Sequence, residues 1–321
     1  MTNQLFLALD YGGTKLSAAL ARRGERSWLA LERVLSPANQ DGAYDRATML
    51  AMARRLLAGQ TPAAIGVSFG GPVNAKLGRV ILSHHIPGWH DTPLREQLQD
   101  ALGAPASVDN DANVGALGEY TFGAGQGCAS LLYVTVSTGV GGGWVLDGKI
   151  WSGADAMAGE IGHTLCDPHG PECVCGRHGC VEVMACGPAI ARDACARLLA
   201  QPNAGAVLRA LVGDDANAVT GERVARAAND GDPLARQVMD SAAHALGFGI
   251  GTAITLINPA RVVIGGGVTK SGDRWWQIVR ESARQNTLPQ IRADLVPAAL
   301  GDDAPLWGAI ALAEQVAVDR D

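Results

Sequence analysis

Three cysteines close together in the sequence, with one upstream histidine, form a candidate metal site. The spacing is C-x-C-x4-C at Cys173, Cys175 and Cys180, and His163 lies ten residues before the first cysteine. Three thiolates and one imidazole complete the tetrahedral shell of a zinc ion, and a closed shell of this kind is structural rather than hydrolytic. His178 competes as a ligand, but it would strain so tight a loop, so we predict His163 as the fourth ligand.

Acidic and amide side chains are concentrated at residues 109–113, where four of five positions are Asp or Asn. A helix cap needs only one such residue. Asp111 could instead accept the proton of a hydroxyl that attacks a phosphoryl group, and Asn110 could hydrogen-bond a neighbouring hydroxyl. Taken alone, the segment fits either helix capping or catalysis.

Two glycine-rich turns, each after an apolar strand, are candidates for phosphate binding, because loops of successive N–H groups bind anions. At the end of the first strand, Asp10 can hold hydrated Mg²⁺. A P-loop is excluded because the only Gly-Lys pair is followed by Ile150, and no set of glycines completes a G-x-G-x-x-G fingerprint. Together with a third glycine cluster, the turns favour nucleotide binding over ordinary hairpins. The three segments comprise Asp10, Gly12, Gly13, Thr14 and Lys15; Ser137, Thr138, Gly139 and Gly141; and Gly265, Gly266 and Gly267.

The composition narrows the class of protein that carries these motifs. The chain has 321 residues, 47% hydrophobic and 18% charged, which excludes a disordered chain and suggests two domains or one large one. The net charge of −6 argues against a nucleic-acid partner. Seven cysteines, an odd number, argue against a disulfide framework, and 41 glycines, about 13%, exceed the usual share of roughly 7%.

We expect a cytoplasmic protein without a membrane anchor. The first residues carry no basic segment and Asp10 interrupts the apolar stretch, so they do not form a signal peptide. Residues 241–258 approach the length of a membrane span, but His244 and three glycines favour a buried helix.

Strands alternate with helices along the chain, which is typical of an α/β fold. A strand–turn–strand pattern at 131–150 repeats that of the first two strands, so we predict a weak internal repeat. Residues 153–187 are expected to be loop-rich and residues 188–258 mainly helical. Further strands are predicted at 4–10, 16–21, 106–108 and 261–264, and residues 63–74 are predicted as a strand that runs into a glycine loop. Further helices are predicted at 43–58, 94–102, 111–122, 272–285 and 305–318.

In their order and spacing, the motifs resemble the ROK family of sugar kinases and repressors over essentially the whole chain. The most specific segments are E-x-G-H (160–163) with the cysteine loop, and N-D-A-N (110–113). The other segments are D-x-G-G-T-K (10–15), G-G-P-V-N (70–74), P-G-W (87–89), S-T-G-V-G-G-G (137–143), N-P (258–259) and G-G-G (265–267).

The resemblance implies a fold and a division into domains. The fold would be the actin-like, ribonuclease-H-like ATPase fold, with two lobes around a cleft. The first lobe would comprise residues 1–118 and 305–321, with the first hairpin and the sugar side. The second lobe would comprise residues 119–304, with the second hairpin, the zinc loop and the adenosine side. The family also implies homodimers or higher homo-oligomers.

The resemblance further implies what the site residues do. ATP with Mg²⁺ would donate the phosphoryl group, its phosphates held by the two hairpins and its adenosine near residues 265–267. Asp111 would be the base in transfer to a sugar 6-hydroxyl. His163 would bind structural zinc through one ring nitrogen and could reach the sugar through the other. The implied sugar-binding residues are Gly71, Asn110, Asp111, Glu160, His163 and Glu182.

Departures from the family pattern leave the sugar open. Ser137 stands where glucokinases usually have glycine, and His84-His85-Ile86 replaces Asn-Leu before P-G-W. The segment at 70–74 is similar to that of N-acetylmannosamine kinases, except for Pro72 in place of a basic residue. We predict an ATP-dependent hexose 6-kinase of the glucokinase type, with an N-acetylmannosamine or N-acetylglucosamine kinase as the alternative.

Two other functions are disfavoured. A sugar-responsive repressor without kinase activity would carry a helix-turn-helix segment, and none precedes the first strand, while Asp10 and Asp111 are intact. Polyphosphate as donor would favour more basic residues than the 26 Lys and Arg present.

Overall fold

The computed structural model describes residues 4–83, 86–213 and 215–318, and the chain divides into two compact units. Unit 1 comprises Met1–Tyr133, Gly143–Gly159 and Ala298–Asp321, and unit 2 comprises Val134–Gly142 and Glu160–Pro297. The His84-His85 pair, where the sequence departs from the family pattern, lies outside the described residues.

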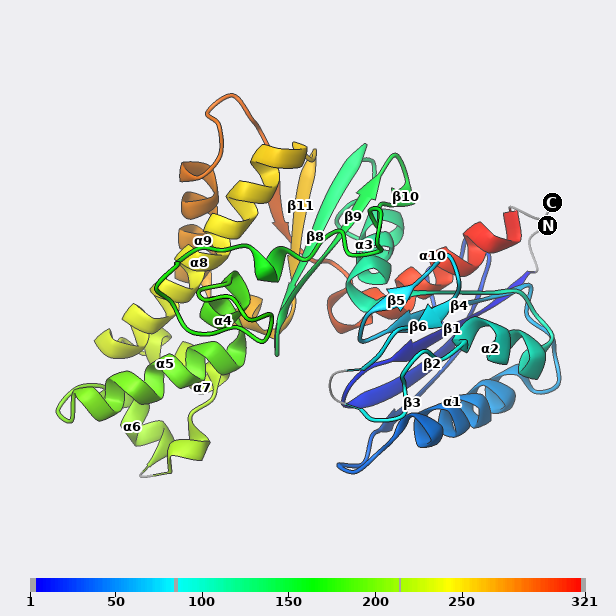
Figure 1. The fold of residues 1–321 in the computed structure, drawn as a ribbon, viewed down its shortest axis with the longest axis horizontal. Coiled ribbons are helices and arrows are strands. Elements are labelled where there is room, and N and C mark those ends of the chain that lie inside the picture. Colours follow the sequence, from blue (N-terminus) through cyan, green and yellow to red (C-terminus); the bar gives the residue numbers. More distant parts are fainter. Residues whose placement is uncertain (1–3, 84–85, 214, 319–321) are drawn as a thin grey trace. The chain divides into compact units, whose positions relative to one another are not determined.

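Unit 1 is built on a five-stranded mixed sheet with the order β3-β2-β1-β4-β7 (Figure 1). β1, β2 and β3 pair antiparallel, whereas β1, β4 and β7 run parallel. The carboxyl ends of these three parallel strands therefore meet at one edge of the sheet. The strands comprise β1 (Leu5–Tyr11), β2 (Lys15–Arg22), β3 (Ala30–Leu35), β4 (Ala64–Phe69) and β7 (Ala106–Asn110), and a small separate sheet pairs β5 (Val73–Asn74) with β6 (Arg79–Val80).

Alternating residues of this sheet face two helical layers. On one face, Leu7 and Leu9 of β1 pack with side chains of two helices, α1 and α2. On the other face, Phe6 and Ala8 pack with side chains of α3 and α10. The helices predicted at 94–102 and 111–122 are confirmed at those bounds. The four helices comprise α1 (Gly42–Leu57), α2 (Leu94–Leu102), α3 (Asp111–Phe122) and α10 (Ala304–Val318).

Close approach of backbones accounts for several glycines of unit 1. A Cβ on Gly66 in β4 would collide with the backbone of Ala309 in α10. A Cβ on Gly308 in α10 would collide with the backbone of Val114 in α3. Backbones can approach this closely only where a Cβ is missing, so part of the glycine excess serves packing rather than ligand binding.

The second five-stranded sheet has the order β10-β9-β8-β11-β12, and the boundary between the units falls within β8 and β9. Numbered along the chain, both sheets have the strand order 3-2-1-4-5. β9 and β10 pair antiparallel and β11 and β12 parallel, as their counterparts do in the first sheet. The predicted strand–turn–strand repeat thus occupies the same position in both sheets. The strands comprise β8 (Ser130–Val136), β9 (Val140–Leu146), β10 (Lys149–Ile150), β11 (Arg261–Gly265) and β12 (Asp294–Pro297).

Helices make up most of the rest of unit 2. The segment at 241–257 lies in α8, whose buried side chains confirm the predicted core helix. None of the described helices is both long enough and apolar enough to cross a bilayer. The α-helices comprise α4 (Val181–Ala185), α5 (Gly187–Ala200), α6 (Ala206–Val212), α7 (Gly221–Asn229), α8 (Pro233–Ile257) and α9 (Asp273–Gln285), and the 3-10 helices comprise η1 (Ile161–His163), η2 (Ala216–Ala218), η3 (Gly267–Ser271) and, in unit 1, η4 (Gly301–Asp303).

The elements absent from the sequence prediction include β3, β12 and α4, and each of these three lacks a strong pattern. β3 and β12 are edge strands whose residues are exposed or only partly buried, so they carry no continuous apolar run. α4 has 5 residues and lies in the segment expected to be loop-rich. A helix of little more than one turn is too short to show helical periodicity.

Candidate functional site

Asp10 is a buried carboxylate at the end of the central strand β1. Its side chain accepts a hydrogen bond of 2.8 Å from the Ser68 hydroxyl on the neighbouring strand β4. Burial raises the pKa of Asp10 to about 6, although the Ser68 hydrogen bond and the charge of Lys15 lower it. The carboxyl can therefore exchange between its charged and neutral forms near neutral pH.

A second acidic group follows β7, where the chain turns into α3. Asn110 caps this helix by accepting from the Ala112 N–H, and its side-chain amide donates to the Gly71 carbonyl at 3.0 Å. Burial raises the pKa of Asp111 to about 6, and the negative charge of Asp10 adds to the effect. The segment therefore serves as a helix cap and also presents a carboxylate that can accept a proton close to neutral pH.

Asp109 and the glycine loop after β4 complete this edge of the sheet. Burial raises the pKa of Asp109, although it accepts hydrogen bonds from the Asn113 side chain at 3.0 Å and from the Asn110 N–H. A Cβ on Gly70 would lie 3.8 Å from the Asp111 carboxylate, so this backbone borders the acidic group. Unit 1 thus brings together Asp10, Gly71, Asn110 and Asp111 of the predicted residues, and adds Ser68.

The first glycine hairpin joins β1 to β2 and presents its tip to solvent. The Gly12 N–H donates to the Lys15 carbonyl, and the Gly13 and Thr14 carbonyls accept from Gln40 and Ser36. Both Gly13 and Thr14 are exposed. With these two carbonyls and the Gly12 N–H already paired, the exposed tip can offer the N–H groups of Gly13 and Thr14 to an anion.

The second hairpin joins β8 to β9 and has no acidic residue of its own. Ser137 and Thr138 are exposed at its tip, and the Val140 N–H donates to the Glu182 carboxylate of α4 at 3.0 Å. A Cβ on Gly139 would lie 2.6 Å from the same Glu182 oxygen, so a larger residue there would force the Glu182 side chain to shift. Glu182, predicted to contact the sugar, therefore braces the second hairpin. Gly141 follows within β9.

A cavity of about 880 Å³ in unit 2 includes the tip of this hairpin. The Gly187 N–H at the start of α5 donates to the Ser137 carbonyl, and a Cβ on Gly266 would collide with the backbone of Val136. Gly265 ends β11, and Gly267 begins η3. The lining comprises Ser137, Thr138, Gly187, Pro188, Ala191, Val219, Thr220, Gly221, Glu222, Ala225, Arg226, Asn229, Asp230, Gly267, Val268, Lys270 and Ser271.

Sequence reasoning missed most of this lining. It identified the hairpin and the glycines at 265–267, but not the contributions of α5, α7 and the rest of η3. The one local sequence signal for this part of the cavity is Thr220 before Gly221. The same pair is typical of the start of a helix, and Thr220 does cap α7. Ser68 was missed in unit 1 because a serine within a buried strand has no motif around it.

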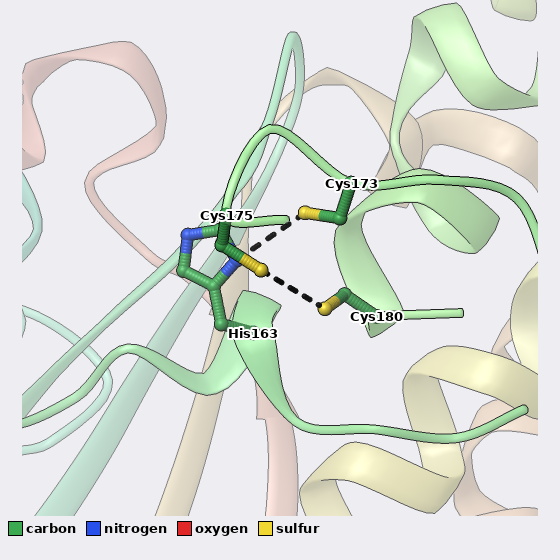
Figure 2. A group of neighbouring side chains, drawn as sticks. All are labelled: His163, Cys173, Cys175 and Cys180. Atoms are coloured by element: carbon green, nitrogen blue, oxygen red, sulfur yellow. Dashed lines mark hydrogen bonds between the residues drawn. The ribbon is translucent and has the colours of Figure 1, made fainter. Parts of the chain in front are cut away.

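The predicted zinc ligands lie together in unit 2, and their four ligand atoms are all within 4.8 Å of one another (Figure 2). His163 Nδ1 lies 3.5 Å from Cys173 Sγ, and Cys175 Sγ lies 3.6 Å from Cys180 Sγ. In a tetrahedral zinc site, ligand atoms lie roughly 3.5–3.8 Å apart, given Zn–S of about 2.3 Å and Zn–N of about 2.0 Å. These two distances match that spacing, so the cluster is compatible with a zinc ion.

The surroundings of the cluster favour metal binding over free thiols. Hydrogen bonds from the backbone and side chain of Arg177 lower the pKa of Cys175 to about 6, which favours the thiolate. Burial raises the pKa of Cys180 to about 12, so this thiol needs the metal itself to displace its proton. His178 instead makes a hydrogen bond to the Gly170 carbonyl, which keeps its Nδ1 out of the cluster.

The second ring nitrogen of His163 faces away from the cysteines. Its Nε2 lies 4.0 Å from the Glu160 carboxylate, which is half exposed. The two glutamates predicted to share a pocket therefore have different partners, since Glu160 lies beside His163 and Glu182 binds the Val140 N–H.

With this geometry established, three comparisons identify what the chain is similar to. The model of the ROK family matches residues 6–316. A glucokinase of Halalkalibacterium halodurans is 36% identical over 318 residues, covering 96% of this chain and 94% of that protein. An N-acetylmannosamine kinase of Shigella boydii is 34% identical, covering 96% of this chain and 98% of that protein.

A solved structure is similar over the same length. The crystal structure of a ROK family glucokinase from Streptomyces griseus, in complex with glucose and AMPPNP, matches with a TM-score of 0.82 and 33% identity, covering 97% of this chain and 99% of that one. This likeness confirms the predicted fold class, the actin-like ATPase fold of ROK sugar kinases. The chain belongs to the ROK family.

Proposed function

We propose that the protein is an ATP-dependent sugar kinase that phosphorylates the 6-hydroxyl of a hexose, in the manner of a glucokinase. The observation that carries the proposal is the pair of acidic groups, Asp10 and Asp111, at the carboxyl ends of parallel strands, each with a pKa raised to about 6. Two carboxylates with different neighbours suit a reaction that needs both a metal-holding group and a base. The names of the Halalkalibacterium and Streptomyces relatives support glucose as substrate.

In the proposed reaction, Asp111 is the general base. The sugar O6–H bond breaks and its proton passes to the Asp111 carboxylate, while O6 forms a bond to the γ-phosphorus of ATP. The bond from that phosphorus to the bridging oxygen breaks, and ADP leaves with the electron pair. Asn110 is held by the Gly71 carbonyl and the Ala112 N–H, so it can orient a sugar hydroxyl beside Asp111.

The donor side of the proposal rests on the hairpins and on the cavity of unit 2. N–H groups at the tips of the first turn (residues 13–14) and the second turn (138–139) would bind phosphates, and the cavity beside Gly267 would take adenosine. Mg²⁺ would be held, through water, by Asp10, and it would neutralise charge on the phosphates. ATP as the donor is supported by the AMPPNP in the Streptomyces complex.

We further propose a structural zinc ion held by His163, Cys173, Cys175 and Cys180. The spacing of the ligand atoms and the low pKa of Cys175 support it. The ion would fix the orientation of the His163 ring, so that Nε2 stays available for a sugar hydroxyl beside Glu160. Metal analysis should find about one zinc per chain.

A coupled ATPase assay with glucose, mannose, N-acetylglucosamine and N-acetylmannosamine tests the proposal. We expect glucose to give the highest kcat/KM, with phosphate on O6 in the isolated product. No turnover with any of the four sugars would overturn it. A preference for N-acetylmannosamine would support the second candidate, which the Shigella boydii relative favours.

Location and assembly complete the proposal. We place the enzyme in the cytoplasm as a homodimer or larger homo-oligomer, as the family suggests, with a small sugar and no nucleic acid as its partner. The net charge of −6 supports the absence of a nucleic-acid partner. Light scattering and a DNA-binding assay test these points.

A further inference from the structure

A single row of polar side chains crosses the sheet of unit 1 at the level of Asp10. Read by strand register, the row runs Arg33 in β3, Ser17 in β2, Asp10 in β1, Ser68 in β4 and Asp109 in β7. Residues paired directly across neighbouring strands point to the same face of a sheet, so all five share one face. The row therefore connects the metal-holding carboxylate to both edges of the sheet.

On the three central strands β2, β1 and β4, the positions of this face further from the acidic edge are apolar, which makes the row conspicuous. One pair of positions further from the acidic edge, Ala8 is flanked by Ala19 and Gly66, and beyond that Phe6 is flanked by Ala21 and Ala64. These alanines and Phe6 are fully buried against the helices α3 and α10. Serines on both sides of Asp10 therefore mark a local requirement rather than a general polarity of the face.

The two serines differ in their hydrogen bonding. The Ser68 hydroxyl donates to Oδ1 of Asp10 at 2.8 Å. Ser17 is 2% exposed, and its hydroxyl has no hydrogen-bond partner among the described residues. An unpaired buried hydroxyl is costly, and here it lies directly across the ladder from a carboxylate that can accept it.

We propose that Ser68 and Ser17 are positioning residues for Asp10, which fix its carboxylate between them for the hydrated Mg²⁺ of the nucleotide. Ser68 is the permanent donor to Oδ1, which leaves Oδ2 free for the metal's water. Ser17 is a second donor that acts only when Asp10 is ionised. Rotation about its Cα–Cβ bond then brings its hydroxyl to the carboxylate. The inference rests on the proposed function, because it takes Asp10 as the group that holds the metal.

The test compares Ser68→Ala and Ser17→Ala with a matched control, Ser107→Ala. Ser107 lies on the same face in β7, opposite Gly66 and outside the row. We expect Ser68→Ala to raise the dissociation constant of Mn²⁺–AMPPNP, measured by electron paramagnetic resonance, by about tenfold, because a hydrogen bond to a charged group is worth about that much. Ser17→Ala should raise it two- to threefold, and Ser107→Ala should leave it unchanged.

A structural role would give a different pattern. If Ser68→Ala lowered the melting temperature while metal–nucleotide affinity stayed at the wild-type value, the inference would be wrong. The same holds if glucose affinity, measured by intrinsic fluorescence, fell together with metal affinity, since that pattern indicates general disruption. Ser68→Thr keeps the hydroxyl and should restore wild-type metal affinity.

The binding measurement separates this inference from the proposed function. If the wild-type protein phosphorylates none of the four sugars but binds Mn²⁺–AMPPNP with the predicted ranking of variants, the proposed function fails and the positioning role stands. If the wild-type protein phosphorylates glucose but the serine variants bind metal–nucleotide equally well, only the inference fails. If the wild-type protein does not bind Mn²⁺–AMPPNP, the positioning role fails as well.

Discussion

The two glycine hairpins occupy the same place in sheets of the same strand order, but they are chemically different. The first strand of one sheet has buried Asp10 one residue before its end, with serines on both neighbouring strands. The first strand of the other sheet ends in Val136, followed by the exposed hydroxyls of Ser137 and Thr138. A repeated scaffold thus carries the acidic chemistry at one copy and neutral binding groups at the other.

The cost of burying charge explains this asymmetry. Burial raises the pKa of Asp10 in the first sheet to about 6, and the charge of Asp10 adds to the effect of burial on the pKa of Asp111. The carboxylate at the second hairpin, Glu182, comes from another element and is satisfied by the Val140 N–H. The first hairpin therefore follows a buried carboxylate of raised pKa, whereas the exposed tip of the second hairpin carries neutral hydroxyls.

Removing the proposed base, Asp111, should have the largest effect on activity of all the substitutions at the two hairpins and their neighbouring acidic groups. Asp111→Asn should lower kcat by about 10³-fold, because general-base catalysis contributes roughly 10²–10⁴-fold. The same change should raise the free energy of unfolding at pH 7 by about 1–3 kcal/mol. A carboxyl whose pKa is raised in the folded state makes the folded protein less stable once it ionises, as the pH rises through that pKa. An amide does not ionise, so the variant avoids this loss of stability. Steady-state kinetics and urea unfolding test the two effects, and near-normal turnover would remove Asp111 from the mechanism.

A paired substitution at the two hairpins tests the asymmetry directly. Asp10→Asn should lower kcat about 10²-fold and weaken the response to Mg²⁺, because the charge that holds the metal is lost. Ser137→Ala, at the corresponding turn, should change kcat less than tenfold, because it removes one neutral hydroxyl. Mg²⁺ titrations at saturating glucose compare the two. Equal losses would mean that the hairpins are chemically alike.

The cluster of His163 and the three cysteines belongs to unit 2, and the zinc ion proposed for it should act on binding rather than on chemistry. Cys180→Ser should reduce the zinc content from about one ion per chain to near zero and raise the KM for the sugar about 10–100-fold, the usual scale for groups that orient a site through a metal. Cys166→Ser is the matched control, since that thiol donates to the Gly179 carbonyl and lies outside the cluster. Zinc retained in Cys180→Ser would disprove the ligand set.

Sequence patterns predicted features that are local in the chain and missed features that depend on tertiary contacts. The cysteine loop and His163 could be identified because metal ligation requires particular side chains at short spacing. Ser68, and the Glu182–Val140 contact, could not, because each joins segments far apart in the chain. The excess of glycine suggested ligand-binding loops, whereas glycines such as Gly66 and Gly308 are required by close packing of the backbone.

The pH dependence should show that the two acidic groups of unit 1 interact. Below about pH 6, Asp111 becomes protonated and cannot act as a base, so kcat/KM should fall about tenfold per pH unit as the pH decreases. The negative charge of Asp10 contributes to this raised pKa. In Asp10→Asn, the activity that remains should therefore begin to fall at a lower pH than in the wild type. Rate profiles from pH 5 to 8 measure both. A wild-type profile that stays flat down to pH 5 contradicts the raised pKa.

The smallest effect should come from the brace of the second hairpin. In Glu182→Ala the Val140 N–H loses its partner, and the turn at Ser137–Gly139 loosens, so the KM for ATP should rise about three- to fivefold with little change in kcat. Glu182→Gln keeps an acceptor oxygen and should behave like the wild type in this respect. If both variants instead raise the KM for the sugar, Glu182 contacts the sugar as its sequence context predicts, and the second hairpin gains a substrate-binding carboxylate that narrows its difference from the first.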